Sequence, residues 1–155
     1  MNDTAENIRA WMVAHGKTLS TAESCTSGRI AAKLTSLSGA SEYFQGGLVA
    51  YQDELKIRFL GVSADTIRQH DVVSREVVEQ MVRGSIDLFH TDYAIASTGY
   101  TGSGANGIAA GTVWLGWGSK DDVHTDCLSG DLGREENTER AARTAIERFE
   151  KFVME

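Results

Sequence analysis

The sequence contains no proline and only two cysteines, and none of its apolar runs approaches the roughly 18 residues that a membrane span needs. Cys25 and Cys127 are too few for a disulfide scaffold, and neither they nor the four scattered histidines have the spacing of metal ligands. Basic residues are also in the minority, because 15 Lys and Arg stand against 22 Asp and Glu, a formal net charge of −7. An acidic chain repels the phosphates of nucleic acids and of anionic membranes. We therefore expect no metal, no other cofactor, no nucleic-acid partner and no membrane partner.

The composition that is present is typical of one globular domain. The 155 residues are 41% apolar, which is enough to build a substantial core. We predict a single domain over residues 1–155. Residues 1–9 are polar and lack the apolar centre of a secretory signal, which favours a cytoplasmic location.

Hydrophobic periodicity and stop signals predict that helices and strands alternate along the whole chain. The expected helices lie at 2–15, 27–37, 53–60, 64–70 and 75–89, followed by a final amphipathic helix whose apolar face covers 142–153. The expected strands lie at 18–22, 46–51, 93–97, 112–117 and 123–128. The runs 46–51 and 93–97 are apolar enough to be buried strands, and 98–111 is expected to form a glycine-rich loop. This alternation predicts a three-layer α/β/α fold with helices on both faces of a mixed, mostly parallel sheet.

A hydroxyl-rich segment, Thr21-Ala-Glu-Ser-Cys-Thr-Ser-Gly28, falls at a predicted strand-to-helix turn. The free N–H groups and the helix dipole at such a turn can bind an anion or stabilise an oxyanion. The alternative is that Ser24, Thr26 or Ser27 simply caps the helix, which is the commoner use of these residue types. Cys25 has two interpretations of the same kind: a nucleophile whose pKa is lowered by the helix N-terminus, or a small core residue.

Lys56 follows a predicted strand by less than one short helix. If the ammonium group were desolvated at the end of the sheet, its pKa would fall and it would become a general base for a serine. An ordinary solvated lysine is the more usual situation. Tyr51, at the end of the same strand, fits either core packing or an active-site hydroxyl.

The glycine-rich loop is a weak signal on its own. A phosphate can approach such a backbone closely, but no Walker A or Rossmann pattern is present, and a flexible connection fits equally well. Arg134 and Arg140 could pair with a phosphate, or form helical ion pairs with nearby glutamates. Ser24, Lys56 and Thr98 all lie at or just after predicted strand ends, where open α/β sheets bind ligands.

In their order along residues 18–150, several segments resemble the CinA C-terminal domain family, which includes nicotinamide mononucleotide deamidases. The most specific is the hydroxyl-rich segment described above. The other matching segments are Gly47-Leu-Val-Ala-Tyr51 with Lys56, Leu60-Gly-Val62, His70-Asp-Val-Val-Ser74, Asp92-Tyr-Ala94, Thr98-Gly99, Gly111-Thr-Val-Trp114 and Ser129-Gly-Asp131.

The resemblance implies an amidase that converts nicotinamide mononucleotide and water into nicotinic acid mononucleotide and ammonia. It implies that this small nucleotide is the partner, that the protein is a homo-oligomer, and that N–H groups at the helix start hold the oxyanion. The catalytic residues implied are a Ser24 nucleophile, a Lys56 base and Tyr51. The substrate-binding candidates are Thr26, Thr98, Gly99, Arg134 and Arg140.

The phosphate-binding half departs from the family pattern. Members usually carry Ala-Gly-Pro in the loop and Lys-Pro-Val-Gly before the next strand, whereas this chain has Tyr100-Thr-Gly-Ser-Gly-Ala-Asn106 and Ile108-Ala-Ala-Gly111. The usual Gly-Asp-Arg is replaced by Gly130-Asp-Leu-Gly-Arg134, and Thr138 stands where a second arginine is expected. Three interpretations stay open: the same reaction, hydrolysis of a different carboxamide, or a nucleotide-binding relative without turnover.

Overall fold

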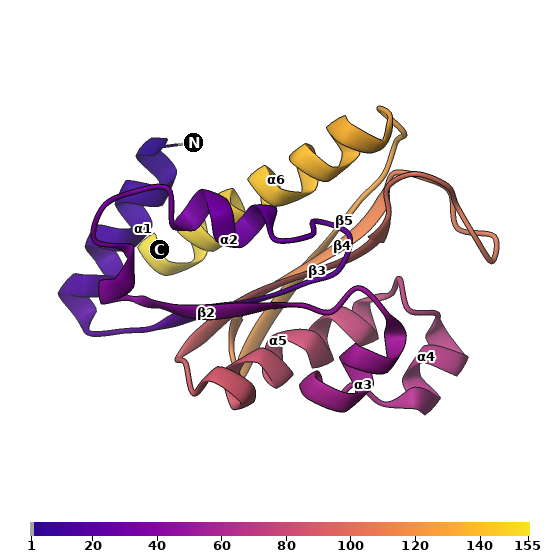
Figure 1. The fold of residues 1–155 in the computed structure, drawn as a ribbon, viewed down its shortest axis with the longest axis horizontal. Helices are drawn as coiled ribbons and strands as arrows, with labels where there is room; N and C mark the ends of the chain where they lie inside the picture. The colour runs from indigo at the N-terminus through magenta and orange to yellow at the C-terminus, as the bar shows by residue number, and fades with distance from the viewer. Residues whose placement is uncertain (1) are drawn as a thin grey trace.

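The computed structural model describes residues 2–155 as an open sheet with helices on both faces (Figure 1). The elements follow in the order α1 (Asn2–His15), β1 (Leu19–Glu23), α2 (Arg29–Leu34), a 3-10 helix (Ala40–Glu42), β2 (Phe44–Val49), α3 (Asp53–Leu60), α4 (Ala64–His70), α5 (Arg75–Phe89), β3 (Tyr93–Tyr100), β4 (Thr112–Ser119), β5 (Asp122–Leu128) and α6 (Arg134–Met154).

The sheet has the strand order β2-β1-β3-β4-β5. Strand β1 pairs in parallel with β2 and β3, whereas β4 is antiparallel to both β3 and β5. Strand β5 therefore runs in the same direction as β1, β2 and β3, and only β4 is reversed. Helices α1, α2 and α6 cover one face, and α3, α4 and α5 cover the other (Figure 1). The predicted three-layer α/β/α fold with a mixed, mostly parallel sheet is confirmed.

Each face of the sheet buries its own apolar cluster. Side chains of α1 and α6, such as Met12 and Phe149, pack with Ile95 of β3 on one face. On the other face α5 contributes Met81, which packs with Ala96 of the same strand. Successive residues of a strand point to opposite faces, so β3 supplies both clusters and anchors the centre of the fold.

Three predicted elements differ most from the structure, and the strands expected at 18–22, 112–117 and 123–128 are shifted or extended by one or two residues. The strand expected to be buried at 46–51 is instead the edge strand β2, whose residues alternate between half-buried and exposed. The helix expected at 27–37 spans only Arg29–Leu34: it starts two residues later because Ser27 and Gly28 have φ values of 51° and 95°, which no α-helix contains, and it ends at its C-cap Thr35. Strand β3 continues to Tyr100 rather than ending at Ser97, because β4 offers it an antiparallel partner to its last residue.

Among residues 2–155, no helix is long and apolar enough to cross a membrane.

Candidate active site

The carboxyl ends of β1, β2 and β3 meet at one edge of the sheet. Glu23, the last residue of β1, is paired with Val49 on one side and with Ser97 on the other. The residues that follow these three positions therefore gather around one cavity of about 330 Å³. Its lining comprises Ser24, Cys25, Tyr51, Asp53, Lys56, Val72, Val73, Thr98, Gly99, Tyr100, Thr101, Gly102, Ser103 and Arg134.

Ser24 is the first residue after β1 and is held by its backbone. Its N–H donates to Ser97 O at 3.1 Å, and its C=O accepts from the N–H of Ser27 at 3.1 Å. Ser24 as a whole is only 8% exposed, and it lines the cavity. The turn thus directs the Ser24 hydroxyl into the cavity while keeping it largely shielded from water.

A buried carboxylate, Glu23, builds this turn. Its Oε1 accepts from the Thr26 hydroxyl at 2.6 Å and from Ile30 N–H at 2.9 Å, and its Oε2 accepts from Ala31 N–H at 3.0 Å. The N–H groups of Ile30 and Ala31 in the first turn of α2 are therefore occupied and are not available to an oxyanion. An oxyanion next to Ser24 would have to use the N–H groups of the turn itself, at residues 25 and 26.

Thr26 lies behind the cavity and is not among the residues that line it. Its hydroxyl is fully buried and shared between Glu23 and the Ser97 hydroxyl, which is 2.7 Å away. The structure therefore gives Thr26 a role in fixing the turn, and its predicted contact with substrate has no structural support.

Cys25 is buried beside Ser24 and belongs to the apolar cluster under α2 and α6. Burial raises the pKa of its thiol to about 12. A thiol with this pKa stays protonated near neutral pH, and the thiolate is the form that acts as a nucleophile. Of the two interpretations of Cys25, the core residue is the one that the structure supports.

Lys56 is buried rather than solvated, with 1% of its surface exposed. Burial lowers the pKa of its ammonium group, and the nearby Asp53 carboxylate partly opposes this shift. The Lys56 Nζ donates to Tyr51 O at 3.2 Å and lies 3.8 Å from Asp53 Oδ1. Helix α3, which carries Lys56, packs closely against α5 because Gly84 of α5 has no side chain. A Cβ at Gly84 would collide with the carbonyl oxygen of Leu60, the last residue of α3.

Three of the remaining predicted residues, Arg134, Thr98 and Gly99, line the cavity. Arg134, at the start of α6, is exposed at the cavity mouth and donates from Nη2 to the Tyr51 hydroxyl at 3.2 Å. Thr98 donates to Val72 O at 3.0 Å and leaves its lone pairs free to accept from a ligand. Gly99 also lines the cavity, and a Cβ there would lie 2.6 Å from Val113 Cγ2.

Arg140 lies outside the cavity. Its Nη2 donates to the carbonyl oxygens of Gly111 and Gly130, at 3.2 and 2.7 Å. It therefore joins the end of the β3–β4 loop to the segment that precedes α6. A direct contact between Arg140 and substrate has no support in this geometry.

Sequence reasoning missed one acidic residue and one aromatic residue that line the cavity, and the acidic partner of the aromatic residue. Asp53 could have been found, because it lies three residues before Lys56 on the same helix and hence on the same face. Tyr100 lines the cavity and donates its hydroxyl to both carboxylate oxygens of Asp71, at 3.1 Å each. The predicted strand 93–97 excludes Tyr100, so the sequence does not place its side chain at the end of the sheet.

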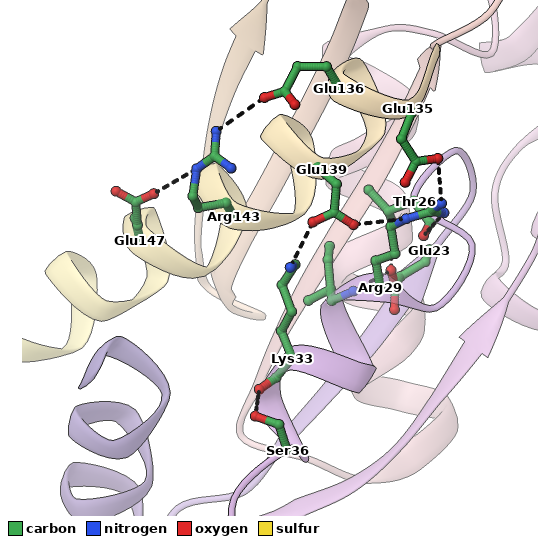
Figure 2. Close-up of polar contacts among 11 residues, drawn as sticks. Glu23, Thr26, Arg29, Lys33, Ser36, Glu135, Glu136, Glu139, Arg143 and Glu147 are labelled. Atoms are coloured by element: carbon green, nitrogen blue, oxygen red, sulfur yellow. Dashed lines mark hydrogen bonds and ion pairs between the residues drawn. The ribbon is translucent and has the colours of Figure 1, made fainter. Parts of the chain in front are cut away.

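Ion pairs fix α2 against α6 on the far side of the turn (Figure 2). Glu139 of α6 accepts from Arg29 at 3.1 Å and from Lys33 at 2.8 Å, and Glu135 lies 3.4 Å from Arg29. The glutamates at the start of α6 therefore bind the neighbouring helix in addition to complementing their own helix dipole. Because α2 follows Ser24 and α6 begins at Arg134, these contacts tie together the two halves of the cavity.

Fold and cavity together define a three-layer α/β/α protein with a serine and a desolvated lysine at the carboxyl end of its parallel strands. The family model of the CinA C-terminal domain matches residues 1–153. The chain belongs to this family.

Its relatives include two kinds of protein. A CinA-like protein from Shewanella pealeana is 41% identical over 126 residues, which are 80% of this chain and 30% of that protein. The chain thus spans about a third of the length of the CinA-like relatives that it matches. The nicotinamide-nucleotide amidohydrolase PncC of Escherichia coli is 34% identical over 152 residues, which are 94% of this chain and 92% of that enzyme.

Solved structures of the CinA superfamily have the same fold. The protein from Klebsiella pneumoniae 700603 superposes with a TM-score of 0.93 at 32% identity, covering 99% of this chain and 97% of its own. The protein from Enterobacter cloacae gives a TM-score of 0.95 at 28% identity, covering 98% of this chain and 91% of its own.

Proposed function

We propose that the protein is an amidase that hydrolyses nicotinamide mononucleotide to nicotinic acid mononucleotide and ammonia. One observation carries the proposal: a lysine with 1% exposure and a lowered pKa shares a cavity with a shielded serine hydroxyl at the ends of parallel strands. Burial makes this lysine easier to deprotonate than a solvated lysine, and the neutral amine is the form that accepts a proton. The similarity to PncC supports the choice of substrate.

The reaction begins with proton transfer between the two side chains. The neutral Lys56 Nζ accepts the proton of the Ser24 hydroxyl, and Ser24 Oγ forms a bond to the carboxamide carbon. Among residues 2–155, Lys56 Nζ donates to Tyr51 O and not to Ser24, so the amine must turn toward Oγ when substrate binds. Such tightening on substrate binding is common, because catalytic hydrogen bonds are often long in the free enzyme.

Two further steps complete the cycle. The carbon–nitrogen bond of the tetrahedral intermediate breaks, and the leaving nitrogen takes a proton from Lys56 and departs as ammonia. Water then attacks the acyl group on Ser24, gives up a proton to Lys56, and releases the carboxylate product with Ser24 regenerated. We assign Thr98 to accept a hydrogen bond from the amide nitrogen, and the backbone N–H groups at residues 25 and 26 to hold the developing oxyanion.

Arg134 is our candidate for the substrate phosphate. It stands at the cavity mouth, which Gly102 and Ser103 of the β3–β4 loop also line, and its guanidinium lies close to Gly102. A guanidinium binds phosphate through two parallel hydrogen bonds. The contact with Tyr51 already orients Arg134 across the cavity.

Ammonia release from nicotinamide mononucleotide and from nicotinamide riboside, which lacks the phosphate, tests the proposal. Arg134→Ala is expected to raise KM for the mononucleotide by about 10- to 100-fold, because a hydrogen bond to a charged group contributes about 1.5–3 kcal/mol. KM for the riboside should change little. Arg148→Ala, which removes a guanidinium paired with Asp126 far from the cavity, is the matched control.

Two results would count against this proposal. An equal rise in KM for both substrates would remove the phosphate role of Arg134. Tight binding of the mononucleotide by the unmodified protein with no ammonia release would show a nucleotide-binding protein rather than an amidase. The homo-oligomeric state and the cytoplasmic location expected from the sequence stay predictions.

A further inference from the structure

We propose that Tyr100, which lines the cavity and is held by its hydrogen bonds to Asp71, forms a specificity wall that selects a carboxamide carried by a positively charged aromatic ring over the same carboxamide on a neutral ring. This inference rests on the proposed amidase function and adds to it a determinant of substrate charge.

Tyr100 lies on β3 close to Thr98, and both residues line the cavity. Tyr100 follows Thr98 by two positions on β3, so both side chains point to the same face of the sheet. Asp71 directly precedes Val72, whose carbonyl accepts from the Thr98 hydroxyl. The hydrogen bonds from Tyr100 to Asp71, which is not among the lining residues, hold the Tyr100 ring in place.

Asp71 is held in an unusual backbone conformation. Its φ of 73° and ψ of 157° lie in a region that glycine occupies almost alone. Strain of this kind clusters at ligand sites, where the surrounding structure over-determines the residue. The side chain gains one local hydrogen bond, from Val72 N–H at 2.9 Å, and otherwise serves the Tyr100 hydroxyl.

The charges around Tyr100 favour a cation. The Asp71 carboxylate accepts its hydroxyl, and Asp53 is the second carboxylate whose charge acts on the same phenol. Of the two cations at the cavity, Lys56 Nζ lies against Tyr51 O and Asp53, and Arg134 donates to the Tyr51 hydroxyl at the mouth. A phenol ring that donates to a carboxylate presents an electron-rich face, and such faces attract cationic groups.

The ligand class follows from these charges. A pyridinium ring is flat, aromatic and cationic, whereas the corresponding dihydropyridine has lost both the charge and the aromaticity. The proposed substrate carries both charges: its cationic pyridinium ring fits against Tyr100, and its anionic phosphate fits against Arg134.

Binding to an inactive variant tests the inference without chemistry. In the Ser24→Ala background, calorimetry would compare nicotinamide mononucleotide with its 1,4-dihydro form, which has the same phosphate and the same amide. We expect the pyridinium form to bind about 10-fold more tightly, as a desolvated cation–π contact predicts. Adding Tyr100→Leu or Asp71→Asn should reduce this ratio to about 2-fold or less. Tyr100→Phe, which keeps the ring, should give an intermediate ratio.

The controls separate this inference from the proposed function. Tyr93→Phe removes a hydroxyl from the aromatic cluster on the opposite face and should leave the ratio unchanged. Asp71→Gly should raise the melting temperature, because glycine relieves the backbone, and yet lower the ratio. Equal affinity for the two forms, or a ratio that Tyr100→Leu leaves unchanged, overturns the inference even if ammonia release is observed. Absence of ammonia release overturns the proposed function and leaves the binding ratio as an independent result.

Discussion

Replacing Lys56 with arginine is expected to lower kcat for ammonia release by about 10²- to 10⁴-fold, which is the usual contribution of a general base. Arginine keeps a positive charge and a long side chain, but its guanidinium cannot lose a proton in a protein and so cannot act as a base. Lys120→Arg, on the surface and paired with Asp87, is the control and should retain full activity. Substantial turnover by Lys56→Arg would rule out the role of Lys56 as the base.

The same residue sets the pH dependence. Because burial lowers the pKa of Lys56 below the ordinary value of 10.5, activity should rise with pH through this lowered pKa. Stability has the corresponding sign: the unfolded chain binds this proton more tightly than the native protein does. Stability is therefore lost as the pH falls from 10.5 through the lowered pKa. Lys56→Met should remove both effects and melt at a higher temperature near neutral pH, although it is inactive.

Replacing Glu23 with alanine is expected to destabilise the fold by about 3 kcal/mol, because it leaves the buried N–H of Ile30 and the half-buried N–H of Ala31 without their acceptor and removes one of the two partners of the Thr26 hydroxyl. In a domain of this size the melting temperature should fall by roughly 10 °C. Glu23→Gln keeps one oxygen acceptor and should lose less.

The control for Glu23 is Glu147→Ala, also a glutamate with an ionic partner but exposed on α6, where the nearest Arg143 nitrogen is 3.9 Å away. It should change the free energy of unfolding by less than about 0.5 kcal/mol. Equal losses for Glu23→Ala and Glu147→Ala, measured by chemical denaturation, would contradict the role of Glu23 in building the turn.

The elements with strong periodicity were predictable from the sequence, and those that depend on neighbours were not. Helices α1, α3 and α4 have the predicted ends, because their apolar spacing and stop signals are local. The prediction that β2 is buried is wrong, because an apolar run in the sequence does not reveal that its strand lies at the edge of the sheet. The predicted end of β3 is wrong, because the end is set by hydrogen bonds to β4, about fifteen residues further along the chain.

The candidate site shows the same division. The meeting of Ser24, Lys56 and Thr98 followed from a general rule, that parallel strands bring their carboxyl ends to one edge. The roles of Thr26 and Arg140 depend on partners that no local pattern indicates: a buried Glu23 for one and two loop carbonyls for the other. The same holds for the contact of Tyr100 with Asp71, which joins residues 29 positions apart.

The measurement that tests the central claim most directly is ammonia release from nicotinamide mononucleotide by the unmodified protein and by Ser24→Ala, with the affinity of each for the mononucleotide measured in parallel. Ser27→Ala, an exposed serine in the same turn, is the control for the substitution itself. We predict release by the unmodified protein and by Ser27→Ala, and none by Ser24→Ala although it still binds the mononucleotide. Release by Ser24→Ala at a rate close to that of the unmodified protein would contradict the account, because the covalent step would then have no nucleophile at residue 24.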